Sequence, residues 1–381
     1  MYDFQDRVKG ALYGLAIGDA MGAPVEGWPP EKIAERFGGH DLSTFLPPTH
    51  GGDPSTGKGD GRVTDDTLMT EALILAYCDH QDHLDAYGYA EFLLPHIKGI
   101  KVWVPEKRRE MDLWDRLWYP EQYSWLRISI FNAEPRCAGR GNLVNCGVAM
   151  WMMPVGAVNV GDPDAAYQES VAIGLAHNES YAVEAGAVMA AAVATGLSPD
   201  GSIKAVVDTA LAFARDGTCL AIDAAIRAAD PSDALSTFIA QTRDATSPYD
   251  PRADHVVDDP ALTITGLSNT GRPSRTASIE ELPVALAVLR YGDGDFFKTL
   301  RAAVYYGRDC DSIASMACCL YGAIYGLRVL PATLRAACDT ANRRDFGAIA
   351  DRFTVSIQAI LGKDADRFAN RQRAVLSSAC C

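Results

Sequence analysis

The sequence predicts a single all-α domain, and three observations lead to this fold class. Apolar residues recur at three-to-four-residue spacing along most of the chain, as they do on the buried face of a helix. No stretch shows convincing strand alternation, and no linker clearly divides the chain. A chain of 381 residues is long enough to bury a sizeable core. We therefore expect one domain over residues 1–381.

The N-terminal part predicts two helices separated by a loop. The first helix covers residues 7–21, and Asp19 lies four residues beyond the apolar Leu15. Asp19 is therefore on or beside the buried stripe, which is an unusual position for a carboxylate. A loop rich in Gly, Pro and Thr is expected over 28–61, and the second helix over 64–78.

The middle of the chain differs in composition from the rest. Residues 99–140 combine several tryptophans with many charges, which is typical of a lid, an insertion or part of an interface. A loop is expected over 241–275. The remaining helices are predicted at 164–175, 180–195, 203–214, 220–229, 278–291, 295–306 and 312–326.

Charge and cysteine usage exclude several classes of function. Acidic residues outnumber basic ones 49 to 35, for a net charge of −14. This balance argues against general binding to nucleic acid or to anionic membranes, because both favour basic patches. We see no secretory signal and no apolar run near the roughly 20 residues that span a bilayer. The ten cysteines include no C-x-x-C pair, so we expect reduced, buried thiols in a cytoplasmic protein.

Two acidic clusters carry the strongest chemical signal. Residues 64–67 read Thr-Asp-Asp-Thr and residues 309–312 read Asp-Cys-Asp-Ser, each at a predicted helix start. Either cluster alone is explained by helix capping, since carboxylates complement a helix N-terminus. Together they offer four carboxylates and several hydroxyls, whose mutual repulsion a divalent cation would relieve. Oxygen ligands of this kind suit Mg²⁺ or Mn²⁺ better than zinc.

Five segments, in order along the chain, resemble the motifs of the ADP-ribosylglycohydrolase family. Residues 10–24 (GALYGLAIGDAMGAP) look like the opening of its members, and 64–67 resemble the first metal motif. Residues 307–314 (GRDCDSIA) are similar to the second metal motif. Residues 145–154 (NCGVAMWMMP) and 176–178 (AHN) look like two further elements of the family. As a set these matches are highly specific.

The resemblance implies an orthogonal helical bundle with a binuclear site for two Mg²⁺ or Mn²⁺ ions. One ligand set carries over to Thr64, Asp65 and Asp66, and the other to Asp309, Asp311 and Ser312, with Asp311 bridging. Glu26 matches an acidic position that some members use catalytically. The family cleaves the bond between the anomeric ribose carbon and a protein side chain or small acceptor. The expected partner is an ADP-ribosylated protein or a small ribosylated ligand.

Hydrolysis of this bond needs a base that activates water as the anomeric carbon gains oxocarbenium character. The candidate bases are Asp19, Glu26, Asp65 and Asp66. Asp311 is expected to be essential because its charge balances the cations. The family's substrate loops place Asn145, Gly147, Trp151 and His177 beside the ligand.

The departures from the family pattern leave the substrate open. Arg308 and Cys310 replace a glycine and a threonine of the second metal motif, and Cys310 should point away from the cations. Cys146 interrupts an Asn-Gly pair, and Trp151 replaces an arginine. An aromatic ring at 151 favours a compact ligand with a planar aglycone. A nucleoside or nucleotide N-glycosidase is therefore an alternative, and a non-catalytic ribosyl-binding or structural relative is a third.

Two weaker signals are assigned to ordinary structure. Residues 52–58 (GDPSTGK) imitate a phosphate-binding loop, but Gly59 replaces the hydroxyl residue that would contact Mg²⁺, and no apolar strand precedes them. A plain loop is expected there. His80 and His83 have a spacing that metal ligands use, but they follow a helix end and are expected to face solvent.

Overall fold

The computed structural model describes residues 2–49, 59–104, 107–249 and 279–376. Within these ranges the chain is helical apart from one two-stranded sheet, which confirms the predicted all-α class. No helix in these ranges combines the length and apolar character needed to cross a bilayer. The loop-like segment 52–58, most of the expected loop 241–275 and the C-terminal Cys380–Cys381 pair lie outside the described residues.

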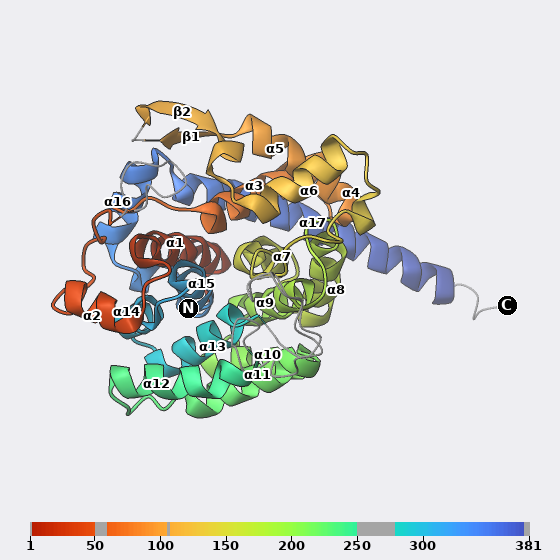
Figure 1. Ribbon diagram of the computed structural model, residues 1–381. Coiled ribbons are helices and arrows are strands. Elements are labelled where there is room, and N and C mark those ends of the chain that lie inside the picture. Colours follow the sequence, from red (N-terminus) through yellow and green to blue (C-terminus); the bar gives the residue numbers. More distant parts are fainter. Residues whose placement is uncertain (1, 50–58, 105–106, 250–278, 377–381) are drawn as a thin grey trace, which may run out of the picture.

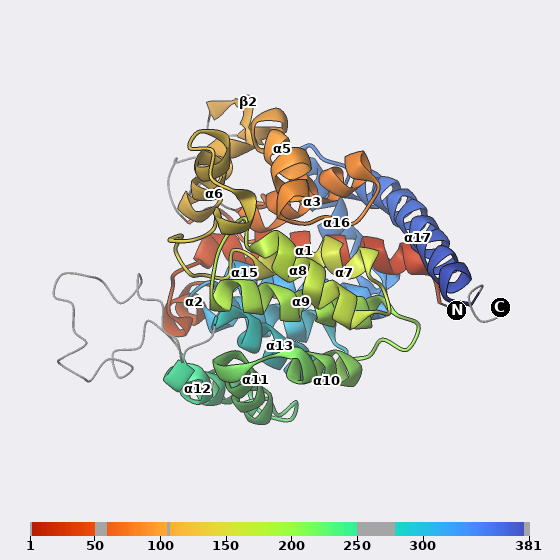
Figure 2. The same cartoon turned by 90° about the vertical axis from the view of Figure 1, so that its right-hand side faces the viewer.

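Two antiparallel helices form the centre of the molecule (Figures 1 and 2). They are α1 (Phe4–Gly22) and α15 (Cys310–Tyr325), and almost every side chain of both is buried. Around this pair pack α9 (Tyr181–Leu197), α13 (Glu281–Gly292) and α14 (Phe296–Tyr306). The apolar core is therefore built around segments from opposite ends of the chain.

A row of glycines sets the distance between α1 and α15. Residues at spacings of four lie on one face of a helix, and α1 has such a row facing α15, made of Gly10, Gly14, Gly18 and Gly22. A Cβ atom at Gly14 would overlap the carbonyl oxygen of Cys318, and one at Gly22 would lie 2.5 Å from the Cα of Asp311. This close approach brings the end of α1 to the start of α15.

The glycine row predicts opposite effects of the same substitution at two helical positions. We expect Gly14→Ala to destabilise the protein by about 1–3 kcal/mol, the usual cost of overpacking a core. Gly362 lies in the exposed part of α17 (Phe346–Leu376) with no atom near its Cβ position. Gly362→Ala should stabilise the protein by about 0.5–1 kcal/mol through helix propensity. Urea unfolding measures both, and a gain of stability from Gly14→Ala would contradict the close packing.

One side of the central pair is covered by the segment that the sequence analysis described as a lid or insertion (Figure 1). It contains a hairpin of β1 (Lys101–Val104) and β2 (Arg109–Asp112), paired antiparallel with Lys101 opposite Asp112. The helix α6 (Tyr119–Ser129) follows. The sequence shows no convincing strand alternation here because four-residue strands are too short for an alternation to stand out. These elements lie over α3 (Asp65–His80), near α5 (Leu94–Gly99).

The opposite side is a layer of three helices, α10 (Ile203–Phe213), α11 (Asp216–Ala228) and α12 (Leu235–Thr246) (Figure 2). The end of α12 corrects the expected loop start at residue 241. A further helix, α2 (Pro30–Phe37), corrects the expected loop over 28–61. The remaining elements are α4 (Ala86–Gly88), α7 (Met153–Val158), α8 (Pro163–Gly174), α16 (Ala332–Asn342), the π-helical turn η2 (Tyr89–Leu93) and the 3₁₀ turns η1 (Ala23–Val25), η4 (Leu113–Arg116), η5 (Pro135–Cys137), η6 (Ala149–Trp151), η7 (Ser247–Tyr249) and η11 (Leu327–Val329).

The two histidines expected to face solvent instead make specific contacts. The Nδ1 atom of His83 lies 2.6 Å from Glu169 and its Nε2 atom 2.9 Å from Asp364 on α17. The hydrogen bond to Glu169 raises the pKa of His83 to about 9 despite partial burial. The ring of His80 packs on Phe92, with centroids 4.4 Å apart. His83 thus links α17 to the body of the protein. The expectation that it faces solvent was wrong because its partners, Glu169 and Asp364, lie far from it in the sequence.

Candidate active site

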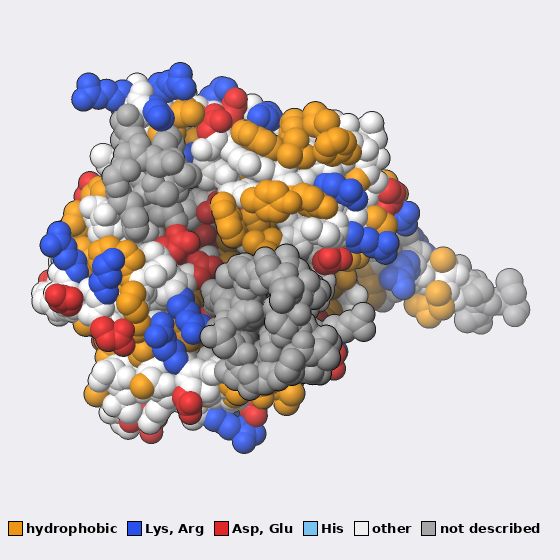
Figure 3. Space-filling view, viewed as in Figure 1, with side chains coloured by type: hydrophobic (Ala, Val, Ile, Leu, Met, Phe, Trp, Pro, Cys, Tyr) orange, Lys and Arg blue, Asp and Glu red, His pale blue; other side chains and the backbone are white. Residues whose placement is uncertain are grey.

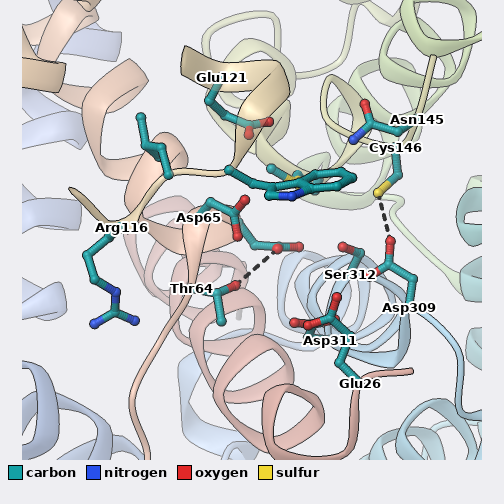
Figure 4. Close-up of a pocket in the computed structure, with 14 residues that line it drawn as sticks. Glu26, Thr64, Asp65, Arg116, Glu121, Asn145, Cys146, Asp309, Asp311 and Ser312 are labelled. Atoms are coloured by element: carbon teal, nitrogen blue, oxygen red, sulfur yellow. Dashed lines mark hydrogen bonds between the residues drawn. The ribbon is translucent and has the colours of Figure 1, made fainter. Parts of the chain in front are cut away.

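A cavity of about 310 Å³ opens where the end of α1 meets the starts of α3 and α15. Acidic side chains are visible in a hollow near the middle of the face in Figure 3, bordered by hydrophobic side chains. The lining residues come from five parts of the chain, at Glu26, 64–66, 116–121, 145–150 and 309–312. Both acidic clusters predicted from the sequence therefore contribute to one cavity (Figure 4).

Asp19, on α1, forms hydrogen bonds with the two threonines of the first cluster. Its carboxylate is fully buried and accepts hydrogen bonds from the backbone N–H and hydroxyl groups of both Thr64 and Thr67, at 2.5 to 3.2 Å. The side chain of Thr64 makes no capping bond of its own. Asp19 thus caps α3 from another helix, satisfying N–H groups that a helix start leaves open. Burial raises its pKa to about 7, although the Thr67 hydroxyl lowers it.

This placement corrects the proposal of Asp19 as a catalytic base. Asp19 is not among the residues that line the cavity, and its oxygens are occupied by the threonine donors. Its carboxylate instead binds Thr64 and Thr67, the residues on either side of the two aspartates. Of these, Asp65 is partly exposed to the cavity, whereas Asp66 is buried, and no hydrogen bond reaches its Oδ1 atom.

The second cluster begins α15 after a turn in which Gly307 and Arg308 both have positive φ, +74° and +54°. Arg308 pairs with Glu280 at 2.7 Å. The thiol of Cys310 donates to the carbonyl of Gly22 on α1 and is not part of the cavity lining. Ser312 does line the cavity.

Burial and neighbouring charge both oppose ionisation of the acidic side chains. Burial raises the pKa of Asp309 well above its usual range, and the nearby carboxylates of Asp311 and Glu281 raise it further. Burial and then Asp19 do the same for the pKa of Asp66. Several anions at low dielectric are tolerated only if they are protonated or balanced by a cation.

The donor atoms fit a hard divalent cation. One carboxylate oxygen from each of Glu26, Asp309 and Asp311 lies within 4.8 Å of the others. The thiol of Cys146, which donates to Asp309 at 3.2 Å, forms a second such group with Glu281 and Asp309. The Oδ1 atom of Asp66, which accepts no hydrogen bond within the described residues, is a further buried oxygen available as a metal ligand. Oxygen donors at this density are typical of Mg²⁺ or Mn²⁺ sites.

The four predicted substrate-binding residues divide into two pairs. Asn145 lines the cavity, and its Oδ1 atom accepts from the N–H of Gly147. A Cβ at Gly147 would lie 3.0 Å from Glu121, so glycine leaves room for that carboxyl group. Trp151 and His177 are fully buried behind the cavity wall, with ring centroids 5.4 Å apart.

Trp151 therefore offers no surface on which a ligand can stack, which corrects its predicted role. The 3₁₀ turn η6 directs the indole into the core, where it also packs on Tyr89. A different tryptophan, Trp118, lines the cavity with 57% of its surface exposed.

Three charged or aromatic cavity residues were missed in the sequence, and all belong to the segment 99–140. They are Arg116, Trp118 and Glu121. Glu121 is in the first turn of α6, directly after Pro120, where an acidic residue is ordinary capping chemistry. Glu121 differs from a capping residue only in being buried. Burial depends on tertiary structure, so the sequence gives no sign of it.

The fold and the cavity together define an all-α protein with a carboxylate-lined site suited to hard cations. Residues 1–362 match the ADP-ribosylglycohydrolase family, and the chain belongs to it. The chain is 25% identical over 349 residues to the uncharacterized protein YegU of Escherichia coli (strain K12), covering 91% of this chain and 95% of YegU. It is 44% identical over 68 residues to the ADP-ribosyl-[dinitrogen reductase] glycohydrolase of Rhodospirillum rubrum, covering 18% of this chain and 21% of that enzyme.

A solved structure supports the fold. The chain superposes on an ADP-ribosylglycohydrolase-related protein complex with a TM-score of 0.59 and 21% sequence identity. The match covers 93% of this chain and 99% of the other.

Proposed function

We propose that the chain is a glycohydrolase that uses two hard divalent cations to cleave the glycosidic bond at the anomeric carbon of an ADP-ribosyl or related ribosyl group. The observation that carries the proposal is the meeting of both acidic clusters in one cavity. Family membership supports the reaction class. The retention of all four aspartates disfavours a purely structural role, because a structural role would not need them together.

The positions of the residues suggest which of them bind the cations and which one accepts a proton. Asp66, Asp309, Asp311 and Glu26 would hold the cations, with Thr64 and Ser312 as hydroxyl donors. When bound, the cations supply positive charge that orients ribose hydroxyls and stabilises negative charge at the reacting oxygens. Asp65 is exposed to the cavity and outside the close carboxylate group, so it is the best-placed residue to accept a proton from the attacking water.

A substrate panel tests the reaction. ADP-ribosylated protein, small ADP-ribosylated acceptors, free nucleosides and free nucleotides are offered in Mg²⁺ or Mn²⁺ buffer, and the free ribosyl product is measured. Release of ADP-ribose supports the main proposal. Release of ribose or ribose phosphate from nucleosides or nucleotides would favour the N-glycosidase alternative, which Trp118 at the cavity now supports in place of Trp151. An inactive protein with every substrate would reject both.

Metal binding gives a separate expected result. Calorimetric titration of the chelator-treated protein with Mn²⁺ should give two ions per chain, and Asp309→Asn should remove at least one of them. A crystal soaked in Mn²⁺ should place the ions between the two clusters. Ordered Asp65, Asp66, Asp309 and Asp311 side chains without a shared ion would contradict the proposed centre.

A further inference from the structure

Glu121 is a buried carboxyl group with no obvious structural partner. Its side chain is 1% exposed, yet it lines the cavity, on the opposite side from Asp311 and Glu26 in the view of Figure 4. No hydrogen bond of normal geometry reaches either of its oxygens within the described residues. A lone carboxylate in such a place is strongly disfavoured. Its presence therefore calls for a function.

A chain of buried hydrogen bonds behind the cavity links Glu121 to His177. The hydroxyl of Ser124 donates to the backbone carbonyl of Glu121 at 3.1 Å. The hydroxyl groups of Ser124 and Tyr89 lie 2.8 Å apart, and either can be the donor. When Tyr89 donates to Ser124, its own oxygen accepts from Nδ1–H of His177, at 3.3 Å.

This order leaves a lone pair on the other nitrogen of His177. Burial lowers the pKa of His177 to about 3, so the ring is neutral, and in this order its Nε2 atom carries no proton. That atom faces Oε1 of Glu121 at 3.6 Å. A carboxylate there would set negative charge against a lone pair, whereas a protonated carboxyl group presents a compatible O–H. Burial also raises the pKa of Glu121 to about 8, although the N–H groups of Glu121 and Trp118 lower it.

We propose that Glu121 is the catalytic acid of the reaction, a role that rests on the proposed function. It enters the cycle protonated and gives its proton to the departing nitrogen or oxygen of the aglycone. The bond from that atom to the anomeric carbon breaks, and its electron pair stays with the leaving group. Water forms the new bond to the anomeric carbon and loses one proton to the base on the acidic side. A later proton from solvent restores Glu121.

Other charged groups line the cavity together with Glu121 and bear on its pKa. Asp65 and Asp66 extend into the cavity from α3, Asp309 and Asp311 from α15, and Glu26 from the end of η1. Arg116, from η4, is the one cation that lines the cavity among the described residues. His177 and Tyr89 face Glu121 from behind. The acidic groups oppose a charge on Glu121, and Arg116 favours one.

The test compares leaving groups in the variant Glu121→Gln. Two substrates carry the same ADP-ribosyl group, one on a basic leaving group such as guanidine and one on an activated phenol. General acid catalysis contributes about 10²–10⁴-fold, so the variant should lose that much in kcat with the basic leaving group. With the phenol, which departs without a proton, the loss should stay below about tenfold. An equal loss on both substrates, or no loss, would overturn the assignment.

The pH profile gives a second readout. In the wild type, activity on the basic leaving group should fall as pH rises through the pKa of Glu121, which is about 8 in the metal-free protein. The Gln variant should lack this alkaline limb. Glu110→Gln, on the exposed strand β2 of the same segment, is the matched control and should leave the rate and the profile unchanged.

Infrared spectroscopy tests the protonation state without turnover. With cations bound, the wild type should show at neutral pH a carboxylic-acid carbonyl band that is absent from Glu121→Gln. Absence of that band in the wild type would overturn the proposal. A wild type that cleaves neither substrate overturns the proposed function and the role of Glu121 with it. An active wild type with an unimpaired variant overturns the role of Glu121 alone.

Discussion

Asp311→Asn should lower turnover at least about a hundredfold, the scale of losing a principal electrostatic group in an active site. Asparagine keeps the shape of the side chain but removes a charge that would balance the cations. The fold should survive. The charge of Asp311 raises the pKa values of Asp19, Asp66 and Asp309, so the variant relieves repulsion in the metal-free protein. Its thermal midpoint without metal should therefore stay level or rise while activity collapses.

Asp164→Asn is the matched control for this prediction. Asp164 is also in the first turn of a helix, α8, but it is exposed and outside the cavity lining. The same chemical change there should leave turnover unaltered. Near-normal activity of Asp311→Asn at saturating metal would show that the site is misplaced.

Trp151→Ala should destabilise the protein by about 3–5 kcal/mol, the range found when a large buried aromatic is truncated. The indole is fully buried between Tyr89 and His177, and its removal leaves a void that its neighbours fill only in part. Denaturant unfolding measures this loss.

Trp118→Ala is the counterpart that separates core from cavity. Trp118 is 57% exposed, so its removal should change stability by less than about 0.5 kcal/mol. It should weaken binding of ADP-ribose in Mg²⁺ buffer by about 1–3 kcal/mol if the indole stacks on the ligand. A binding loss in Trp151→Ala without a loss of stability would restore the role that the sequence suggested for Trp151.

The helices that the sequence revealed are those with dense apolar or alanine-rich faces. The helix α9 was expected at 180–195 and runs from Tyr181 to Leu197. By contrast, α17 was not anticipated, because its later turns are exposed and charged and show no buried face. The hairpin of β1 and β2 was too short to leave a pattern.

The candidate site was predictable where chemistry is local and unpredictable where it depends on burial. The two acidic clusters could be paired from the sequence because each keeps its carboxylates within four residues. The sequence placed Asp19 on a buried stripe, but only the three-dimensional structure shows that it caps α3. The positions of Trp151 and Glu121 depend on how η6 and α6 pack, which no local pattern records.

The pairing of α1 with α15 also has a consequence for biosynthesis. The ribosome completes α1 among the first 22 residues, whereas α15 begins at Cys310. At about 5–20 residues per second, the nascent helix waits roughly 15–60 s for its partner. During that interval the glycine face of α1 has nothing to pack against, and Asp66 lacks the second cluster with which it would share a cation. The proposed metal centre could therefore form only late in synthesis, and a chain that stops before Cys310 would emerge without it.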